Sequence, residues 1–139
     1  MALSLKQADA VLRVGIAKAS ELGVPMNIAV LDDGAHLKAF ARMDGALLGS
    51  IDIALRKAKT AALFAMNTEA LGELCKPGGP SPGLAATNDV LVSFAGGIPL
   101  RDGGGAVIGS VGVSGGAVGQ DYAVALAAGS APALERPSG

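Results

Sequence analysis

The chain contains 139 residues with 11 basic and 12 acidic side chains, and its composition is 50% hydrophobic and 17% charged. This length is typical of a single domain, which we expect to span residues 1–139, with an ordered core at about 3–129 and a frayed tail at 132–139. The net charge of −1 excludes the strongly basic surface of nucleic-acid-binding proteins, so no nucleic acid is expected as a partner.

The mean hydropathy of +0.48 is high for a chain with so few charges. It indicates either a membrane span or apolar surface buried between subunits. The longest uncharged stretch, Gly103 to Gln120, is interrupted by glycines and does not form an apolar run of about 20 residues. Lys6, Asp9 and Arg13 interrupt the N-terminal apolar pattern, unlike a signal peptide. We therefore expect a homo-oligomer with no membrane partner. The single cysteine, Cys75, agrees with a cytoplasmic location.

The first predicted element is an amphipathic helix. Ser4 and Gln7 have the spacing of a capping box at its start, and Gly23 followed by Pro25 signals its end. Its apolar face follows the spacing i, i+3, i+4, i+7 and consists of Ala8, Val11, Leu12, Gly15, Ala19 and Leu22.

A β-hairpin is predicted next, with a strand at Met26–Leu31, a turn at 32–35 and a return strand at His36–Met43. Side chains alternate between the two faces of a strand. One face of the return strand therefore carries His36, Lys38, Phe40 and Arg42. The other face, which we expect to belong to the core, carries Leu37, Ala39, Ala41 and Met43.

Two helices and an irregular loop follow the hairpin. The first helix is predicted to begin near Ser50 as its N-cap, with Asp52 in its first turn. The second is predicted over about Thr68–Leu74, and residues 76–83 are too rich in proline and glycine for regular structure. Cys75 is interpreted as structural, because reactive thiols favour helix N-termini. The buried stripe of the first helix is predicted to consist of Ile51, Leu55, Ala58 and Ala62.

A second hairpin and a final helix complete the predicted elements. Strands at about 98–101 and 106–113 flank a glycine-rich turn at 102–105, and the helix is predicted at about 117–128. The three glycines of the turn precede a strand and do not open a helix, so they do not form a dinucleotide-binding loop.

Several segments, in the same order along the chain, resemble motifs of the GlcG/HbpS-like family, which also includes the C-terminal domain of some corrinoid adenosyltransferases. These segments contain the runs VLDDGAHL, FARMDGA, KAKTA, FAGGIPL and IGSVGVSGG, followed by Gln120 and Asp121. The resemblance covers roughly residues 3–129.

The resemblance implies an α+β fold with an antiparallel sheet flanked by helices in a profilin-like layout. It also implies oligomers built from dimers. Some members of the family bind haem, and others are encoded beside genes for small-acid or diol catabolism. The family has no shared set of catalytic residues that could be carried over to this chain.

His36 is the only histidine, and imidazole is the usual axial ligand of a b-type haem. His36 is therefore the candidate axial ligand if haem is a cofactor, and the alternative is a solvated side chain beside a turn. No Cys-x-x-Cys-His motif exists for covalent haem attachment. One histidine and one cysteine cannot build a common zinc site within one chain, so no metal site is predicted there, and a symmetric site between subunits stays open.

Arg42 and Asp44 lie where the return strand leads into a glycine-containing turn. The planar fork of arginine is suited to a carboxylate, so Arg42 could anchor a small acid. The alternative is an Arg42–Asp44 ion pair that locks the loop. His36 and Arg42 lie six residues apart on one strand, about 20 Å, so they cannot contact the same small acid within a subunit.

Ser114 lies within a G-x-S-x-G run between a strand and a helix, the context of a nucleophile elbow. A serine hydrolase is disfavoured because no histidine follows Ser114 in the chain. The amides of Gly115 and Gly116 could instead form an anion nest at a helix start, or they could simply make a tight turn. Asp121, in the first turn of the helix, would satisfy part of the helix dipole.

These residues lead to three hypotheses about function. The first is a homo-oligomer that binds a small carboxylate or a similar metabolite. Its ligand-binding residues would be Arg42, Gly96, Gly97, Ser114, Gly115 and Gly116. The second is haem binding through His36. The third is an enzyme acting on a small acid by general acid/base chemistry, with Arg42 as anchor and Asp44 as base.

Overall fold

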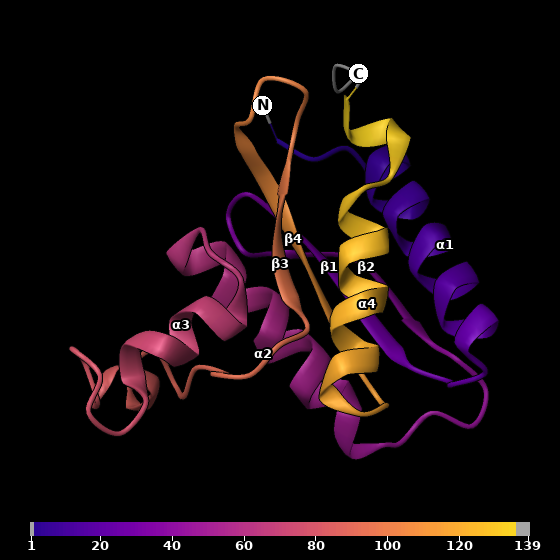
Figure 1. The fold of residues 1–139 in the computed structure, drawn as a ribbon. Coiled ribbons are helices and arrows are strands. Elements are labelled where there is room, and N and C mark those ends of the chain that lie inside the picture. Colours follow the sequence, from indigo (N-terminus) through magenta and orange to yellow (C-terminus); the bar gives the residue numbers. More distant parts are fainter. Residues whose placement is uncertain (1, 136–139) are drawn as a thin grey trace.

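Four antiparallel strands form one sheet in the order β2-β1-β4-β3 in the computed structural model, which describes residues 2–135 (Figure 1). The strands are β1 (Asn27–Asp32), β2 (Leu37–Arg42), β3 (Gly97–Arg101) and β4 (Val107–Ser114). Both predicted hairpins are present, and each boundary lies within one residue of its predicted place. The pairing of β1 with β4, which joins the two hairpins into one sheet, was not indicated by any local pattern.

Helices cover both faces of this sheet, so the predicted α+β class and the antiparallel sheet flanked by helices are confirmed. The helices α1 and α4 lie side by side on one face, and α2 crosses the other (Figure 1). The elements are α1 (Leu5–Leu22), α2 (Gly49–Phe64), α3 (Thr68–Cys75) and α4 (Val118–Gly129), with short 3-10 turns at Leu84–Ala86 and Pro132–Glu135. No helix among residues 2–135 has the length and apolar character needed to cross a membrane.

The capping box predicted for α1 is present, because Ser4 Oγ accepts from the Gln7 amide at 3.1 Å and Gln7 Oε1 accepts from the Ser4 amide at 3.0 Å. Gly23 ends the helix in the left-handed conformation, as its position predicted. Most of the predicted apolar face is buried, but Leu22 at its end remains 37% exposed.

The larger hydrophobic core lies between the sheet and the α1–α4 pair. It includes Val11, Ile28, Val111, Val113 and Val124. Ala39 and Met43 of the predicted core face of β2 pack against it, whereas Leu37 is 57% exposed and was wrongly assigned to the core. Leu37 lies at the end of an edge strand next to the turn, where the pairing register with β1 shifts.

The stripe by which α2 packs on the sheet differs from the predicted one. Its buried residues are Ser50, Ala54, Lys57, Ala58, Thr60 and Ala61, whereas Ile51, Leu55 and Ala62 are only partly buried. A Cβ at Gly112 of β4 would lie 2.0 Å from the Ala54 carbonyl oxygen, so glycine lets the α2 backbone approach the strand closely. This close approach favours small residues on α2, such as Ala54, Ala58 and Ala61, where the helix meets the sheet.

Two further predictions are corrected at chain segments outside the sheet. The N-cap of α2 is Leu48, not Ser50, which is buried inside the helix. Residues 132–135 do not fray, because Pro132–Glu135 forms a 3-10 turn with Leu134 only 2% exposed in the larger core. The rest of the predicted tail, 136–139, lies outside the described residues.

Candidate functional site

Arg42, Asn27 and Ser114 form a row of polar side chains across three strands. Asn27 in β1 is paired with Arg42 at the end of β2 and with Ser114 at the end of β4. Directly paired residues project from the same face of a sheet, and here it is the face that α2 covers. Neighbouring strands are about 4.8 Å apart, which places the Cα atoms of Arg42 and Ser114 about 10 Å apart.

Two pockets adjoin the segment that follows β2. One, of about 200 Å³, is lined by Arg42, Met43, Asp44, Gly45 and Ala46. The other, of about 420 Å³, is lined by Ile16, Ala41, Arg42, Met43 and Asp44. Both charged residues are exposed at the surface.

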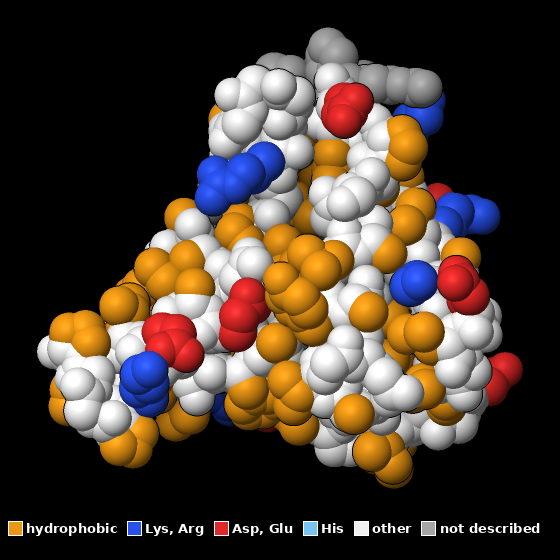
Figure 2. All heavy atoms as spheres, in the orientation of Figure 1, with side chains coloured by type: hydrophobic (Ala, Val, Ile, Leu, Met, Phe, Trp, Pro, Cys, Tyr) orange, Lys and Arg blue, Asp and Glu red, His pale blue; other side chains and the backbone are white. Residues whose placement is uncertain are grey.

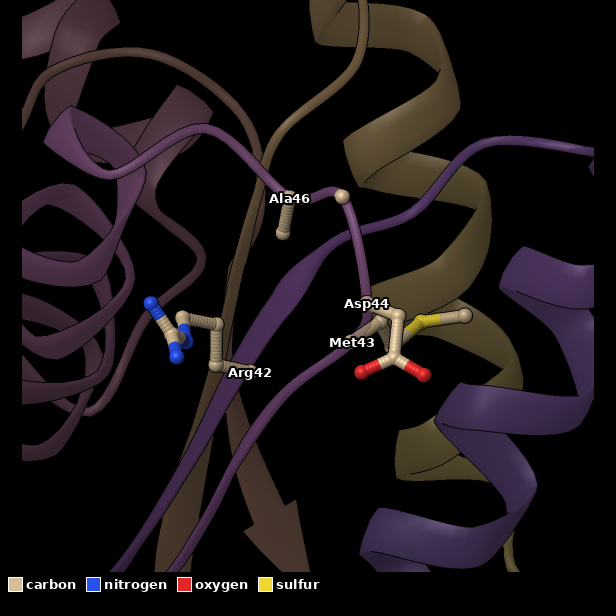
Figure 3. A pocket seen from close by; sticks show the side chains of 5 residues that line it. Arg42, Met43, Asp44 and Ala46 are labelled. Carbon is tan, nitrogen blue, oxygen red and sulfur yellow. The ribbon is translucent and has the colours of Figure 1, made fainter.

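Arg42 and Asp44 project in opposite directions from the chain (Figure 3). Within residues 2–135 neither takes part in an ion pair within 4.0 Å, so the alternative of an Arg42–Asp44 clamp is not formed. The guanidinium is therefore available to an external carboxylate. The carboxylate of Asp44 faces away from it, and the two groups do not converge on one point.

Asn27 lies between Arg42 and Ser114 and is completely buried. Its Nδ2 donates to the carbonyl oxygen of Leu47 at 2.9 Å, which ties β1 to the loop in front of α2. Its Oδ1 is buried and has no hydrogen-bond partner among the described residues. Asn27 was not predicted as a site residue, although a lone asparagine in the apolar run Met26–Leu31 is a signal for a buried polar group.

The glycine-rich turn before α4 is closed by side chains of its own helix. The amide of Gly116 donates to Asp121 Oδ1 at 2.9 Å, and the amide of Ala117 donates to Gln120 Oε1 at 2.9 Å. A Cβ at Gly115, whose φ is +150°, would lie 2.9 Å from the Pro25 carbonyl oxygen. This geometry matches the tight-turn alternative, and Asp121 satisfies the helix start as expected.

Lys57 and Asp121 form an ion pair with side chains 0% and 4% exposed, while every other ion pair among residues 2–135 lies at the surface. Lys57 Nζ lies 3.1 Å from Asp121 Oδ2, donates to the Val113 carbonyl at 2.8 Å, and lies 5.0 Å from the centre of the Phe94 ring. Burial lowers the pKa of Lys57 below its usual value, and the attraction of Asp121 partly offsets this.

Gly96 packs against the Lys57 amine, whereas Gly97 packs against the Lys57 backbone and Thr68. A Cβ at Gly96 would lie 2.6 Å from Lys57 Nζ, and the amide of Gly97 donates to Thr68 Oγ1 at 3.0 Å. Gly96 immediately precedes β3 and Gly97 begins it, at the edge of the sheet opposite β2. The role of Lys57 was not predicted from the sequence, although its spacing from Ala54 and Ala61 places it within a helical stripe.

His36 lies at the surface beside the first hairpin turn, with its side chain 82% exposed. Its Nδ1 lies 3.5 Å from Asp32 Oδ1. The same carboxylate accepts from the backbone amides of His36 and Gly34, and these hydrogen bonds lower the pKa of Asp32. His36 lines neither of the two pockets beside Arg42.

The last candidates from the sequence are the thiol of Cys75 and side chains that could bind a metal ion. Cys75 is a free, partly buried thiol at the end of α3, with its Sγ 3.8 Å from the Gly72 carbonyl oxygen. Within residues 2–135 no group of three or more His, Cys, Asp or Glu side chains is placed to hold a metal ion.

Residues 3–130 match the family described as "Haem degrading protein HbpS-like". The chain is 43% identical over 110 residues to a 15.0 kDa protein from the dhaT–dhaS intergenic region of Citrobacter freundii, covering 78% of this chain and 77% of the relative. It is 37% identical over 112 residues to the protein GlcG of Escherichia coli K12, covering 81% of each. A crystal structure of a PduOC:heme complex superposes with a TM-score of 0.88 at 33% identity, over 94% of this chain and 95% of that one.

The Lys57–Asp121 ion pair generates a prediction about stability. Removing one partner leaves an uncompensated buried charge, so Lys57→Met and Asp121→Asn are each expected to lower the free energy of unfolding by about 3–5 kcal/mol. The double variant is expected to lose less than the sum of the two single losses, as chemical denaturation would measure. Strict additivity would show that the two groups do not stabilise each other.

The lowered pKa of Lys57 adds a dependence on pH. Between this lowered pKa and the unfolded value of about 10.5, the unfolded chain holds the lysine proton and the folded protein does not. The free energy of unfolding therefore rises with pH in this window, and this rise is expected to be missing from Lys57→Met in the same buffers.

Proposed function

We propose that this chain, which belongs to the HbpS-like family of haem-degrading proteins, is a homo-oligomer that binds a small carboxylate at Arg42. The observation that carries the proposal is the exposed guanidinium of Arg42, which lines both pockets and forms no ion pair within residues 2–135. A guanidinium offers two parallel donors to a carboxylate, and this geometry is the strongest that a side chain provides for such a group.

The proposed binding site consists of Arg42 with Asn27 and Ser114 in the adjacent strands. Gly115 and Gly116 lie outside it, because Asp121 already occupies the amide of Gly116. Gly96 and Gly97 also lie outside it, because they pack around Lys57 and Thr68.

Binding is favoured over catalysis by the directions of the two charged side chains. An acid/base enzyme with Arg42 as anchor and Asp44 as base needs both groups on the same ligand. They point apart (Figure 3), and they face different surroundings. We therefore propose a binding protein, with no nucleic-acid or membrane partner in its role and a cytoplasmic location, which the free thiol of Cys75 supports.

The carboxylate site is tested by replacing the fork of Arg42 while keeping its charge. Arg42→Lys is expected to weaken lactate binding by about 1.5–3 kcal/mol, roughly a 10- to 150-fold rise in Kd, as measured by titration calorimetry. Arg13→Lys, at an exposed arginine of α1 that pairs with Asp9, is the matched control and should bind as the unaltered protein does. Equal Kd values for all three proteins would remove Arg42 from the site.

The homo-oligomer is supported by apolar side chains left at the surface. They include Leu47, Leu48, Leu63, Val90 and Phe94, each at least 44% exposed. Figure 2 shows hydrophobic side chains gathered on the face between α3 and α4. Such surface is commonly buried between subunits.

Light scattering is expected to give the mass of a dimer or a larger assembly of the purified protein at micromolar concentration. Association would bury the apolar side chains that a single chain leaves in contact with water. A stable monomer at that concentration would contradict the proposed assembly.

Haem is a second candidate ligand, favoured by the similarity to a chain solved as a PduOC:heme complex. The imidazole of His36 could serve as an axial ligand, because it is exposed and its Nδ1 lies beside the Asp32 carboxylate. This carboxylate would orient the ring. Bound haem would supply redox-active iron, and the residues of this chain would hold and orient it.

Adding hemin to the protein is expected to produce a sharp Soret band that His36→Ala abolishes, because the iron would lose its imidazole. Lys38→Ala, at an exposed neighbouring position, controls for a general change in the hairpin surface. A Soret band that persists in His36→Ala, or no band in the unaltered protein, would remove His36 as a haem ligand.

A further inference from the structure

Asn27 Oδ1 is a buried acceptor that the protein itself does not satisfy. The side chain is 0% exposed, and no donor among the described residues reaches this oxygen. An unsatisfied buried polar atom is unfavourable by about 1–3 kcal/mol, so folded proteins usually supply it with a partner, a water or a ligand. Among residues 2–135, the other unsatisfied buried side-chain oxygen belongs to Glu69, a residue that is only partly buried.

The orientation of the Asn27 amide is determined by its contact with the following loop. Nδ2 donates to the Leu47 carbonyl, which can only accept. Turning the amide over would place oxygen against oxygen, so Oδ1 remains the free end. The atom therefore requires a donor from outside the protein.

This free oxygen lies beside the group proposed to bind a carboxylate. Asn27 and Arg42 are directly paired in β1 and β2, and the Cβ atoms of such pairs are about 4.5–5.5 Å apart on one face of the sheet. The 200 Å³ pocket is lined by residues 42–46, and the next residue, Leu47, is the one that holds the Asn27 amide.

Two features of the surroundings agree with a polar ligand at this place. The first turn of α2 follows Leu47, and its N-cap residue, Leu48, provides no side-chain hydrogen bond to the helix amides. Ser114, paired with Asn27 on the other side, is 4% exposed, and its hydroxyl forms no hydrogen bond within the described residues. In this row, Asn27 Oδ1 is therefore the buried acceptor without a partner among the described residues, while Asn27 Nδ2 is paired with Leu47.

We propose that Asn27 selects the ligand by accepting a hydrogen bond from a hydroxyl or amino group on the carbon next to the carboxylate that Arg42 binds. The ligand class is then a small 2-hydroxy or 2-amino acid, and simple fatty acids of the same size are discriminated against. This inference rests on the proposed carboxylate site and adds the specificity that a guanidinium alone lacks. A site built to pair with a hydroxyl rejects an analogue without it, because the buried acceptor is then left unpaired.

Three acids of similar size test the proposal on the unaltered protein. Lactate carries the 2-hydroxyl, propionate lacks it, and 2-methoxypropionate keeps the oxygen but has no hydrogen to donate. Titration calorimetry is expected to give a Kd for lactate at least about tenfold below that of either other acid. Equal binding of all three acids, with the Arg42→Lys effect intact, would overturn the role of Asn27 and leave the carboxylate site standing; Oδ1 would then hold a water that the ligand does not displace.

A variant provides the second measurement. Asn27→Ala, checked for folding by circular dichroism, is expected to bind lactate and propionate with Kd values within about twofold of each other, because the acceptor is gone. A preference for lactate that persists in this variant would show that the hydroxyl pairs elsewhere. If the variant does not fold, the comparison of lactate with 2-methoxypropionate decides alone, and failure of all three acids to bind would overturn the carboxylate site together with this inference.

Discussion

The buried ion pair between Lys57 and Asp121 connects the two layers of helices that the sheet separates. Lys57 belongs to α2 on one face and Asp121 to α4 on the other, and they meet beside the end of β4, where Lys57 also donates to the Val113 carbonyl. Removing either partner would leave the other charge buried and unpaired, which strongly destabilises a folded protein. The glycine at position 96 follows from this constraint, because a side chain there would overlap the lysine amine.

The same ion pair affects which backbone amides near α4 are free to bind a ligand. Asp121 uses one carboxylate oxygen for Lys57 and the other for the amide of Gly116, so the glycine-rich start of α4 is satisfied internally. Within residues 2–135, Asn27 Oδ1 and the Arg42 guanidinium lie next to each other in β1 and β2, and neither has a partner in a hydrogen bond or ion pair. The ion pair thus lies beside β4, and the proposed ligand site lies at β1 and β2.

A guanidinium beside a buried amide oxygen is chemistry suited to recognition. Arg42 attracts a negative charge, and Asn27 can distinguish what is attached beside that charge, because a buried acceptor penalises a ligand that brings no donor. Neither arginine nor asparagine is a usual general acid or base. The carboxylate that could act as a base, Asp44, projects away from Arg42. The arrangement therefore supports the proposal that the protein binds a small acid without converting it. A haem bound by His36 would lie away from the two pockets beside Arg42.

The elements of this fold could be predicted from local patterns, because caps, turns and apolar periodicity act over a few residues: the capping box at Ser4, the stop at Gly23 and both hairpins were recognised in this way. Motif resemblance identified the family and placed Arg42 among the candidate residues. Pairings between distant segments were not predictable, because no local pattern records that β1 lies against β4 or that Lys57 reaches Asp121, 64 residues farther along the chain. Only the tertiary structure decided that Gly115 and Gly116 serve a turn and that Asn27 is left with a free oxygen, since whether a polar atom is satisfied depends on every segment folded around it.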